Sequence, residues 1–203
     1  MKCDSCGNSS DFAVRKKFIV CDYCGTIIES NAADSSIEKT DTVAFVEDIN
    51  SKSIALVLPI FHEWSKNHNS IQIAPGLSQK KINKFLSSWE DLTWFKDTSA
   101  NYSGENVNGV EPEKLGIFAQ VDCTIFGSAK ESVVITWGGI AFKEIGENPD
   151  YVNWSDFHSK PTTSVGIISP VLKVGQANIS FSGSDVTGKM LPELISILNS
   201  MCK

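Results

Sequence analysis

The stretch GIFAQVDCTIFGSAKESVVITWGGIAFKE, residues 116–144, decides the fold. It holds three runs rich in apolar and β-branched residues, at 116–126, 132–137 and 139–144, and short glycine-containing segments separate them. Runs of this kind, bounded by turn residues, predict β-strands. Strands joined by such short turns must pair in antiparallel fashion. The stretch therefore predicts the centre of an antiparallel sheet.

The same pattern continues toward the C-terminus. Further strands are predicted from YVNW at 151–154, PVLKV at 170–174 and ANISF at 177–181. A helix is predicted from about Thr187 to Met201, because its apolar residues recur at helical spacing: Leu191, Leu194, Ile195 and Leu198. An antiparallel sheet with a terminal amphipathic helix belongs to the α+β class.

Residues 43–114, upstream of this sheet, give mixed patterns. SIALVLPIFHEW at 53–64 fits a buried helix with a proline near a break, and IQIA at 71–74 alternates like a strand. A helix capped by Ser78 is predicted from a single apolar stripe, formed by Ile82, Phe85, Leu86 and Trp89. Residues 98–114 predict a long loop.

Residues 122–143 also resemble a hairpin of small bacterial proteins with a pleckstrin-homology-like fold. The resemblance lies in an Asp-x-Thr-x-Phe-Gly-Ser-Ala-Lys turn at 122–130, followed by Ile135-Thr136, Gly139-Ile140 and Lys143. It implies a roll or a partly open barrel in residues 115–203. Proteins of this shape mostly bind peptides or phospholipid headgroups, and the resemblance implies no catalytic residue.

Four of the six cysteines lie near the N-terminus, in two Cys-x-x-Cys-Gly motifs: Cys3, Cys6, Cys21 and Cys24. We call these four residues the knuckle cysteines. Two residues between thiolates let both sulfurs face one point, and the following glycine permits the tight turn that completes a metal-binding knuckle. Fourteen residues separate the two motifs, and AVRKKFIV at 13–20 predicts a strand leading into the second.

One zinc ion held by the knuckle cysteines is the main expectation, with iron and redox chemistry as the alternatives. A site with four thiolates has no open position for water, so this metal would be structural. Residues 3–28 resemble a zinc ribbon. We therefore expect a ribbon at 1–28, a flexible linker at 29–42 and an α+β domain at 43–203.

Charge and length limit the possible partners. The chain has 203 residues and a formal net charge of -6, which repels polyanions and favours a basic protein partner. Its longest apolar run, at 53–61, contains a proline and falls short of the roughly 20 residues that a membrane span needs. The N-terminus lacks the apolar stretch of a secretory signal. We expect a cytoplasmic protein without membrane insertion.

Three functions stay open. The first is a non-enzymatic interaction protein that binds or inhibits a basic partner, as in a toxin–immunity pair. The second is a nucleic-acid-associated regulator that contacts phosphates through Arg15, Lys16 and Lys17. The third is an enzyme whose site is assembled from distant residues. No catalytic residue is nominated, because the three histidines are scattered and Gly183–Lys189 has Met190 where a phosphate-binding loop has Ser or Thr.

Overall fold

The computed structural model divides the chain into two compact units, Met1–Phe45 and Val46–Lys203. It describes residues 48–89, 110–125 and 127–202 in full, and only the backbone elements within 12–47. The boundary after Phe45 lies close to Val43, where the sequence predicts the start of the second domain. The described ranges contain no helix that is long and apolar enough to cross a membrane.

The first unit contains a three-stranded antiparallel sheet. Its strands are β1 (Phe12–Arg15), β2 (Phe18–Cys21) and β3 (Ile27–Ile28), in that order across the sheet. Arg15 pairs with Phe18 and Phe12 pairs with Cys21. The segment 13–20, predicted as one strand, is therefore split between two paired strands. The apolar residues on both sides of Arg15-Lys16-Lys17 satisfy a strand pattern equally well as one run or two, so the pattern alone could not place the break.

The long helix α1 (Glu38–Ser65) begins earlier than the sequence suggests. Its first five residues lie in the predicted linker 29–42. Acidic residues such as Glu38 and Asp41 are favoured in the first turn of a helix, but this polar composition also resembles a linker. Pro59 does not break the helix. The carbonyl of Ala55, which Pro59 leaves without a helical donor, lies on the exposed face and can bond to water.

The central sheet has five antiparallel strands that follow one another across the sheet in chain order. They are β4 (Ile71–Ile73), β5 (Ile117–Asp122), β6 (Ser132–Thr136), β7 (Gly139–Lys143) and β8 (Asp150–Asn153). The three strands predicted from residues 116–144 are confirmed as β5, β6 and β7, but β5 ends at Asp122, before the predicted end at residue 126. Their pairing, with Val134 opposite both Gln120 and Ala141, confirms the antiparallel arrangement.

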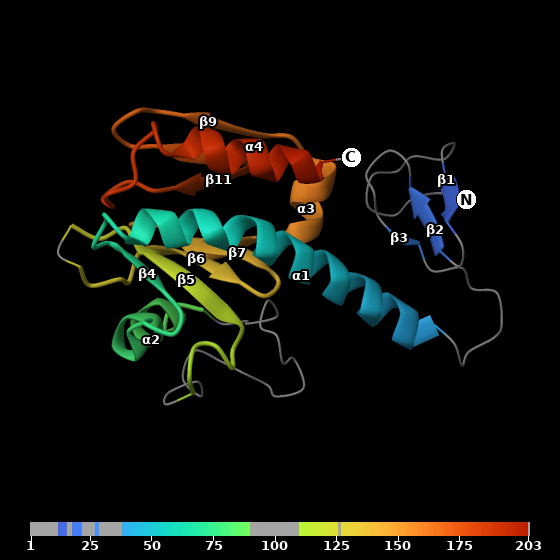
Figure 1. Ribbon diagram of the computed structural model, residues 1–203, viewed down its shortest axis with the longest axis horizontal. Coiled ribbons are helices and arrows are strands. Elements are labelled where there is room, and N and C mark those ends of the chain that lie inside the picture. The colour runs from blue at the N-terminus through green and yellow to red at the C-terminus, as the bar shows by residue number, and fades with distance from the viewer. Residues whose placement is uncertain are drawn as a thin grey trace. The chain divides into compact units, whose positions relative to one another are not determined.

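Both faces of the central sheet are covered, as Figure 1 shows. On β6, Val133 and Ile135 pack into a core with α1, whereas Val134 packs into a second core. This alternation follows from the two-residue period of a strand. The second core contains Ile82 and Phe85 of α2 (Gln79–Leu86), so the helix predicted after Ser78 is confirmed. The Ser78 side chain makes no capping hydrogen bond, and the helix ends before Trp89.

A smaller antiparallel sheet and two helices complete the second unit. The strands are β9 (Thr162–Val165), β10 (Val171–Val174) and β11 (Ala177–Ser180), and β10 lies in the middle. The helices are α3 (Trp154–Ser159) and α4 (Leu191–Met201). In Figure 1, α4 and this sheet lie on the side of α1 away from the central sheet.

The α+β class, the antiparallel sheets and the C-terminal helix are thus confirmed. The described strands form two sheets in the second unit, where the sequence suggested a single roll or partly open barrel. Neither α3 nor β9 was predicted. Trp154 was placed in a strand, but it begins α3, where it and Phe157 are fully buried one helical turn apart.

Candidate functional site

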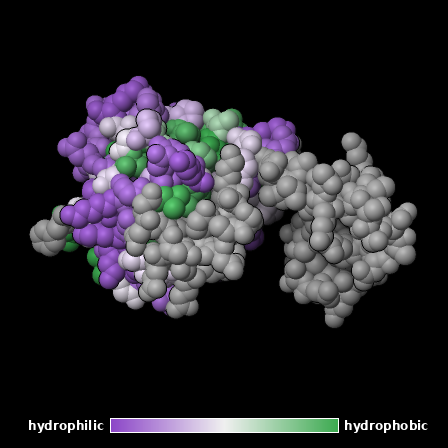
Figure 2. All heavy atoms as spheres, turned by 90° about the horizontal axis from the view of Figure 1, so that it is seen from below, coloured by the Kyte–Doolittle hydropathy of each residue, from purple (hydrophilic) through white to green (hydrophobic). Residues whose placement is uncertain are grey.

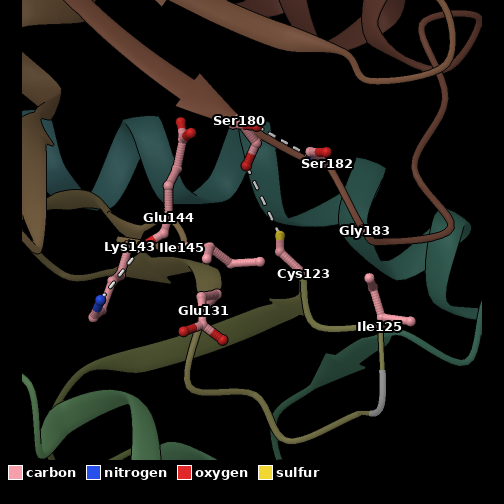
Figure 3. Close-up of a pocket in the computed structure, with 9 residues that line it drawn as sticks. All are labelled: Cys123, Ile125, Glu131, Lys143, Glu144, Ile145, Ser180, Ser182 and Gly183. Carbon is pink, nitrogen blue, oxygen red and sulfur yellow. Dashed lines mark hydrogen bonds between the residues drawn. The ribbon is translucent and has the colours of Figure 1, made fainter. Parts of the chain in front are cut away.

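The described residues surround a pocket where the two sheets of the second unit meet. The residues come from strand ends that adjoin in space: β5 ends before Cys123, β6 begins after Glu131, β7 ends before Glu144, and β11 ends at Ser180. The pocket has a volume of about 180 Å³ and is lined by Cys123, Ile125, Glu131, Lys143, Glu144, Ile145, Ser180, Ser182 and Gly183. Figure 3 shows these side chains.

The thiol of Cys123 lies inside this pocket but is not reactive. Its Sγ lies 3.8 Å from the carbonyl oxygen of Ser180 and 3.6 Å from that of Val121, both of which accept from a protonated thiol. Burial raises the pKa of Cys123 to about 12. Because the thiolate is the nucleophilic form, this cysteine is not an activated nucleophile at neutral pH.

Two carboxylates and one ammonium group lie around the pocket. Burial raises the pKa of Glu144, the negative charge of Glu147 adds to this rise, and the backbone amide of Ser180 opposes it. The Nζ of Lys143 donates to the backbone carbonyl of Glu147 at 3.0 Å and to that of Glu144 at 3.4 Å. In Figure 3 the ammonium group of Lys143 points away from Cys123. The lining therefore offers the carboxylates of Glu131 and Glu144 to a cationic ligand.

The pocket mouth is apolar as well as acidic. Ile125 and Ile145 are 78% and 71% exposed, and Ile167 and Ile168, which do not line the pocket, are 72% and 92% exposed. Figure 3 shows the Ile145 side chain directed toward Cys123, with Ile125 on the far side of that cysteine. The described residues on the face seen in Figure 2 are mainly hydrophilic, with hydrophobic residues in small separate patches. The pocket mouth thus combines two exposed isoleucines with the carboxylates of Glu131 and Glu144.

Close backbone packing fixes the segment that crosses the pocket from β11. Gly183 has φ +83, and a Cβ atom at this position would lie 2.2 Å from the carbonyl oxygen of Cys123. Only glycine fits so close an approach. Two hydrogen bonds connect Asp185 with Ser70, which precedes β4: each backbone amide donates to the other side chain at 3.1 Å. The pocket wall is therefore tied to the edge of the central sheet.

Next to the pocket, Asp122 organises the turn between β5 and β6. Its Oδ1 accepts from the backbone amides of Thr124 and Ala129 at 3.0 and 3.2 Å, and also from the Thr124 hydroxyl. Its Oδ2 lies 2.9 Å from the Nζ of Lys81 on α2. Burial alone would raise the pKa of Asp122, but the bonds from Thr124 and Lys81 outweigh this effect and hold the pKa below its usual range. The Asp-x-Thr turn of residues 122–130 thus has a structural explanation.

The one serine–histidine pair recorded among the described side chains does not form a catalytic site. The Oγ of Ser53 lies 3.1 Å from Nε2 of His158. Ser53 is fully buried on α1, so a substrate has no access to its hydroxyl. A serine nucleophile must reach its substrate's reacting atom. The pair is better explained as a contact between α1 and α3.

Most residues nominated from the sequence lie outside the described residues. This holds for Cys3, Cys6 and Cys24 and for Lys16 and Lys17, whereas Cys21 and Arg15 are described only as the last residues of β2 and β1. Among the fully described residues, no group of three or more histidine, cysteine, aspartate or glutamate side chains could hold a metal ion. The metal site at the knuckle cysteines stays a prediction.

The motif Gly183–Lys189 stands between β11 and α4, but its glycines serve packing. Gly188 donates its backbone N–H to the carbonyl of Ile167, and a Cβ atom there would lie 2.4 Å from the carbonyl oxygen of Gly166. The predicted start of the last helix at Thr187 is too early, because α4 begins at Leu191 with Met190 as its N-cap. Pro192 falls in the first turn, where its missing N–H costs little.

No family model, curated protein or solved structure matches this chain. The resemblances to zinc ribbons and to pleckstrin-homology-like proteins therefore stay predictions. The pocket was not predicted from the sequence. Its residues come from four strand ends between Cys123 and Gly183, and only the pairing of the strands brings them together.

Proposed function

We propose that this chain is a non-enzymatic interaction protein whose α+β domain binds a basic protein partner. The observation that supports this proposal most is that the carboxylates of Glu131 and Glu144 and two exposed isoleucines line the same pocket. Protein interfaces combine apolar contacts at their centre with charges that select the partner. The net charge of -6 acts in the same direction, because it accelerates the encounter with a cationic protein.

The chemistry of the pocket favours binding over catalysis. The Cys123 thiol, with its pKa raised to about 12, stays protonated. The carboxyl of Glu144 has a raised pKa, a property that general acids share, but the groups that shift this pKa besides burial are the Ser180 amide and Glu147, which do not form a proton relay. Inhibition of a basic toxin is one concrete form of the proposed function.

A structural zinc ion in the first unit belongs to the same proposal. The knuckle cysteines supply four soft thiolate ligands, which suit a closed tetrahedral zinc site. Cys21 ends β2, directly before the residues that separate it from Cys24. In such a site the metal would stabilise the fold of the ribbon, and the two cysteines of each motif would hold it. This ribbon would accompany the binding domain without taking part in a reaction.

The proposed function can be tested by affinity capture. Zinc-replete full-length chain is immobilised and exposed to native lysate of the source organism, beside an unrelated acidic protein of equal charge. We expect the chain alone to retain a protein of high isoelectric point, released as salt rises, because the Debye length falls from about 10 Å at 0.1 M to about 3 Å at 1 M. Retention of nucleic acid instead would favour the regulator, and retention of no specific protein would overturn the proposal.

A further inference from the structure

The size of the pocket limits what can occupy it. Its volume of about 180 Å³ is below the roughly 300–1,000 Å³ of sites that hold cofactors and drug-sized ligands. It is close to the volume of about 150 Å³ that accommodates a benzene molecule in an engineered protein cavity. The pocket therefore matches one large apolar side chain of another protein.

The lining places an apolar centre between two acidic groups. Ile125 and Ile145 lie on either side of Cys123, and the side chains of Glu131 and Glu144 extend in opposite directions in Figure 3. Lys143 forms no ion pair with either carboxylate among the described residues, since its ammonium group donates to the carbonyls of Glu144 and Glu147, and with its charge included the lining stays net negative. A ligand that matches this arrangement is apolar in the middle and cationic on both sides.

We propose that the pocket binds a basic segment of the partner protein, with one large aliphatic or aromatic side chain inserted between Ile125 and Ile145 and a Lys or Arg on each side facing Glu131 and Glu144. This inference rests on the proposed function and names the surface and the segment that carry it. The inserted side chain removes the exposed isoleucines from water, which supplies the hydrophobic part of the affinity. The flanking cations select a basic partner.

The carboxyl of Glu144 adds a dependence on pH. Its pKa is raised in the free protein by burial and by Glu147. A Lys or Arg placed beside it favours the charged form and lowers this pKa, so binding releases a proton. Affinity therefore rises as the pH increases through the raised pKa of Glu144. The Glu144→Gln variant should lose the part of this pH dependence that comes from Glu144, whereas the Glu131→Gln variant should keep it.

The test uses fluorescein-labelled peptides and full-length protein, with binding followed by fluorescence anisotropy at 50 mM salt. One peptide has the sequence Gly-Arg-Lys-Leu-Lys-Arg-Gly, and the other has Ser in place of the central Leu. We expect the Leu peptide to bind at least about 5-fold more tightly, because only leucine fills the pocket. The Ile145→Ser variant should lose this preference. Leu56→Ser is the matched control, because Leu56 is an exposed residue on α1 of the same size as isoleucine. This variant should keep the preference for the Leu peptide.

The carboxylates are tested in the same assay. Glu131→Gln and Glu144→Gln should each weaken both peptides, whereas Glu193→Gln, which removes a charge from the exposed first turn of α4, should leave them unchanged. All substituted side chains are exposed or half-buried, and circular dichroism verifies that each variant folds.

Several outcomes would overturn this inference while the capture experiment still stands. Equal binding of the Leu and Ser peptides would mean that charge alone attracts the partner. Equal effects of Ile145→Ser and Leu56→Ser would exclude the pocket as the site. Binding of neither peptide, or concentration-dependent dimers in sedimentation that Ile145→Ser abolishes, would show that a basic segment is not the occupant. If only the capture experiment fails, the result would overturn the basic partner of the proposed function and not the assignment of the pocket.

Discussion

Replacing Asp122 with asparagine should destabilise the second unit, because this carboxylate joins α2 to the turn beside the pocket. Its side chain is only 4% exposed, and Oδ2 lies 2.9 Å from the Nζ of Lys81. Asparagine keeps an acceptor for the amides of Thr124 and Ala129. If its oxygen takes the place of Oδ1, its NH₂ group faces Lys81, so two donors meet where a bond existed.

The magnitude follows from the number and burial of these bonds. A hydrogen bond to a charged group contributes about 1.5–3 kcal/mol, and breaking a buried ion pair costs about 3–5 kcal/mol. Lys81 is 27% exposed and can turn toward water, which reduces the loss. We therefore expect Asp122→Asn to lower the free energy of unfolding by about 2–3 kcal/mol. With a urea dependence of about 2 kcal/mol per M, the unfolding midpoint falls by about 1 M or slightly more.

Urea unfolding followed by tryptophan fluorescence measures this change, and Asp48→Asn is the matched control. Asp48 and Lys52 form a pair at 2.7 Å whose side chains are 56% and 69% exposed. An exposed pair of this kind contributes less than about 1 kcal/mol, so the control midpoint should stay close to that of the original chain. Equal midpoints for Asp122→Asn and the original chain would refute the assigned role of Asp122.

The pH dependence provides an independent check. Because the pKa of Asp122 is lowered on folding, its stabilising contribution is fully present above the ordinary carboxyl pKa of about 3.9 and is lost as the pH falls through the folded value. The difference between Asp122→Asn and the original chain should therefore be constant from pH 7 to pH 5 and shrink at pH 3. A difference that grows toward acid pH would contradict the sign of this shift.

Three further predictions concern the metal, the pocket thiol and the pocket backbone. Purified chain should contain about one zinc ion per molecule by elemental analysis, and replacing both cysteines of one knuckle with serine should abolish it; bound iron would favour the alternative metal. Iodoacetamide should leave Cys123 unmodified in folded protein at pH 8 and modify it in urea, and peptide mass mapping measures this modification. Rapid labelling of Cys123 in the folded protein would contradict the raised pKa of about 12 for this thiol. Gly183→Ala should lower the free energy of unfolding by about 3 kcal/mol, measured by urea unfolding. The control Gly146→Ala should lower it by about 1 kcal/mol, because Gly146 has a similar φ of +79 but no neighbour within 4 Å. Equal losses would mean that the contact with Cys123 has no effect.

The elements that could be predicted are those whose apolar residues follow a pattern typical of a single kind of element, a strand or a helix. Apolar and β-branched runs bounded by turn residues identified β6 and β7 correctly, because both faces of the central sheet are buried and all five residues of β6 are buried. The stripe Leu191, Leu194 and Leu198 identified α4 for the same reason, since all three side chains are fully buried.

The elements that escaped prediction lack such a pattern. In β9 the buried residue is Thr162, while Val165 is 48% exposed, so apolar and buried positions do not coincide. The Asn199 side chain of α4 bonds to both the backbone N–H and the carbonyl of Thr162, at 2.6 and 2.8 Å, and thereby covers this edge strand. This contact joins residues 37 positions apart, and no local pattern predicts it.

The pocket could not be predicted for a related reason. Glu131, Glu144 and Ile145 stand in polar turns, where such residues are common and carry no pattern of their own. Their meeting point depends on which strands pair and on where each strand ends. The acidic charge of the whole chain indicates a basic partner, which stays a prediction, and it does not indicate the surface that would bind this partner.

Photochemical crosslinking from the pocket to the captured partner tests the central claim most directly. A benzophenone amino acid is placed at Ile145 in one version of the full-length chain and at Leu56 in another, and the crosslinked peptides are sequenced by mass spectrometry. We predict an adduct from position 145 with a Lys- or Arg-rich segment around one large apolar residue, and none with that segment from position 56. An adduct from position 56 alone, or an acidic segment at position 145, would contradict the claim.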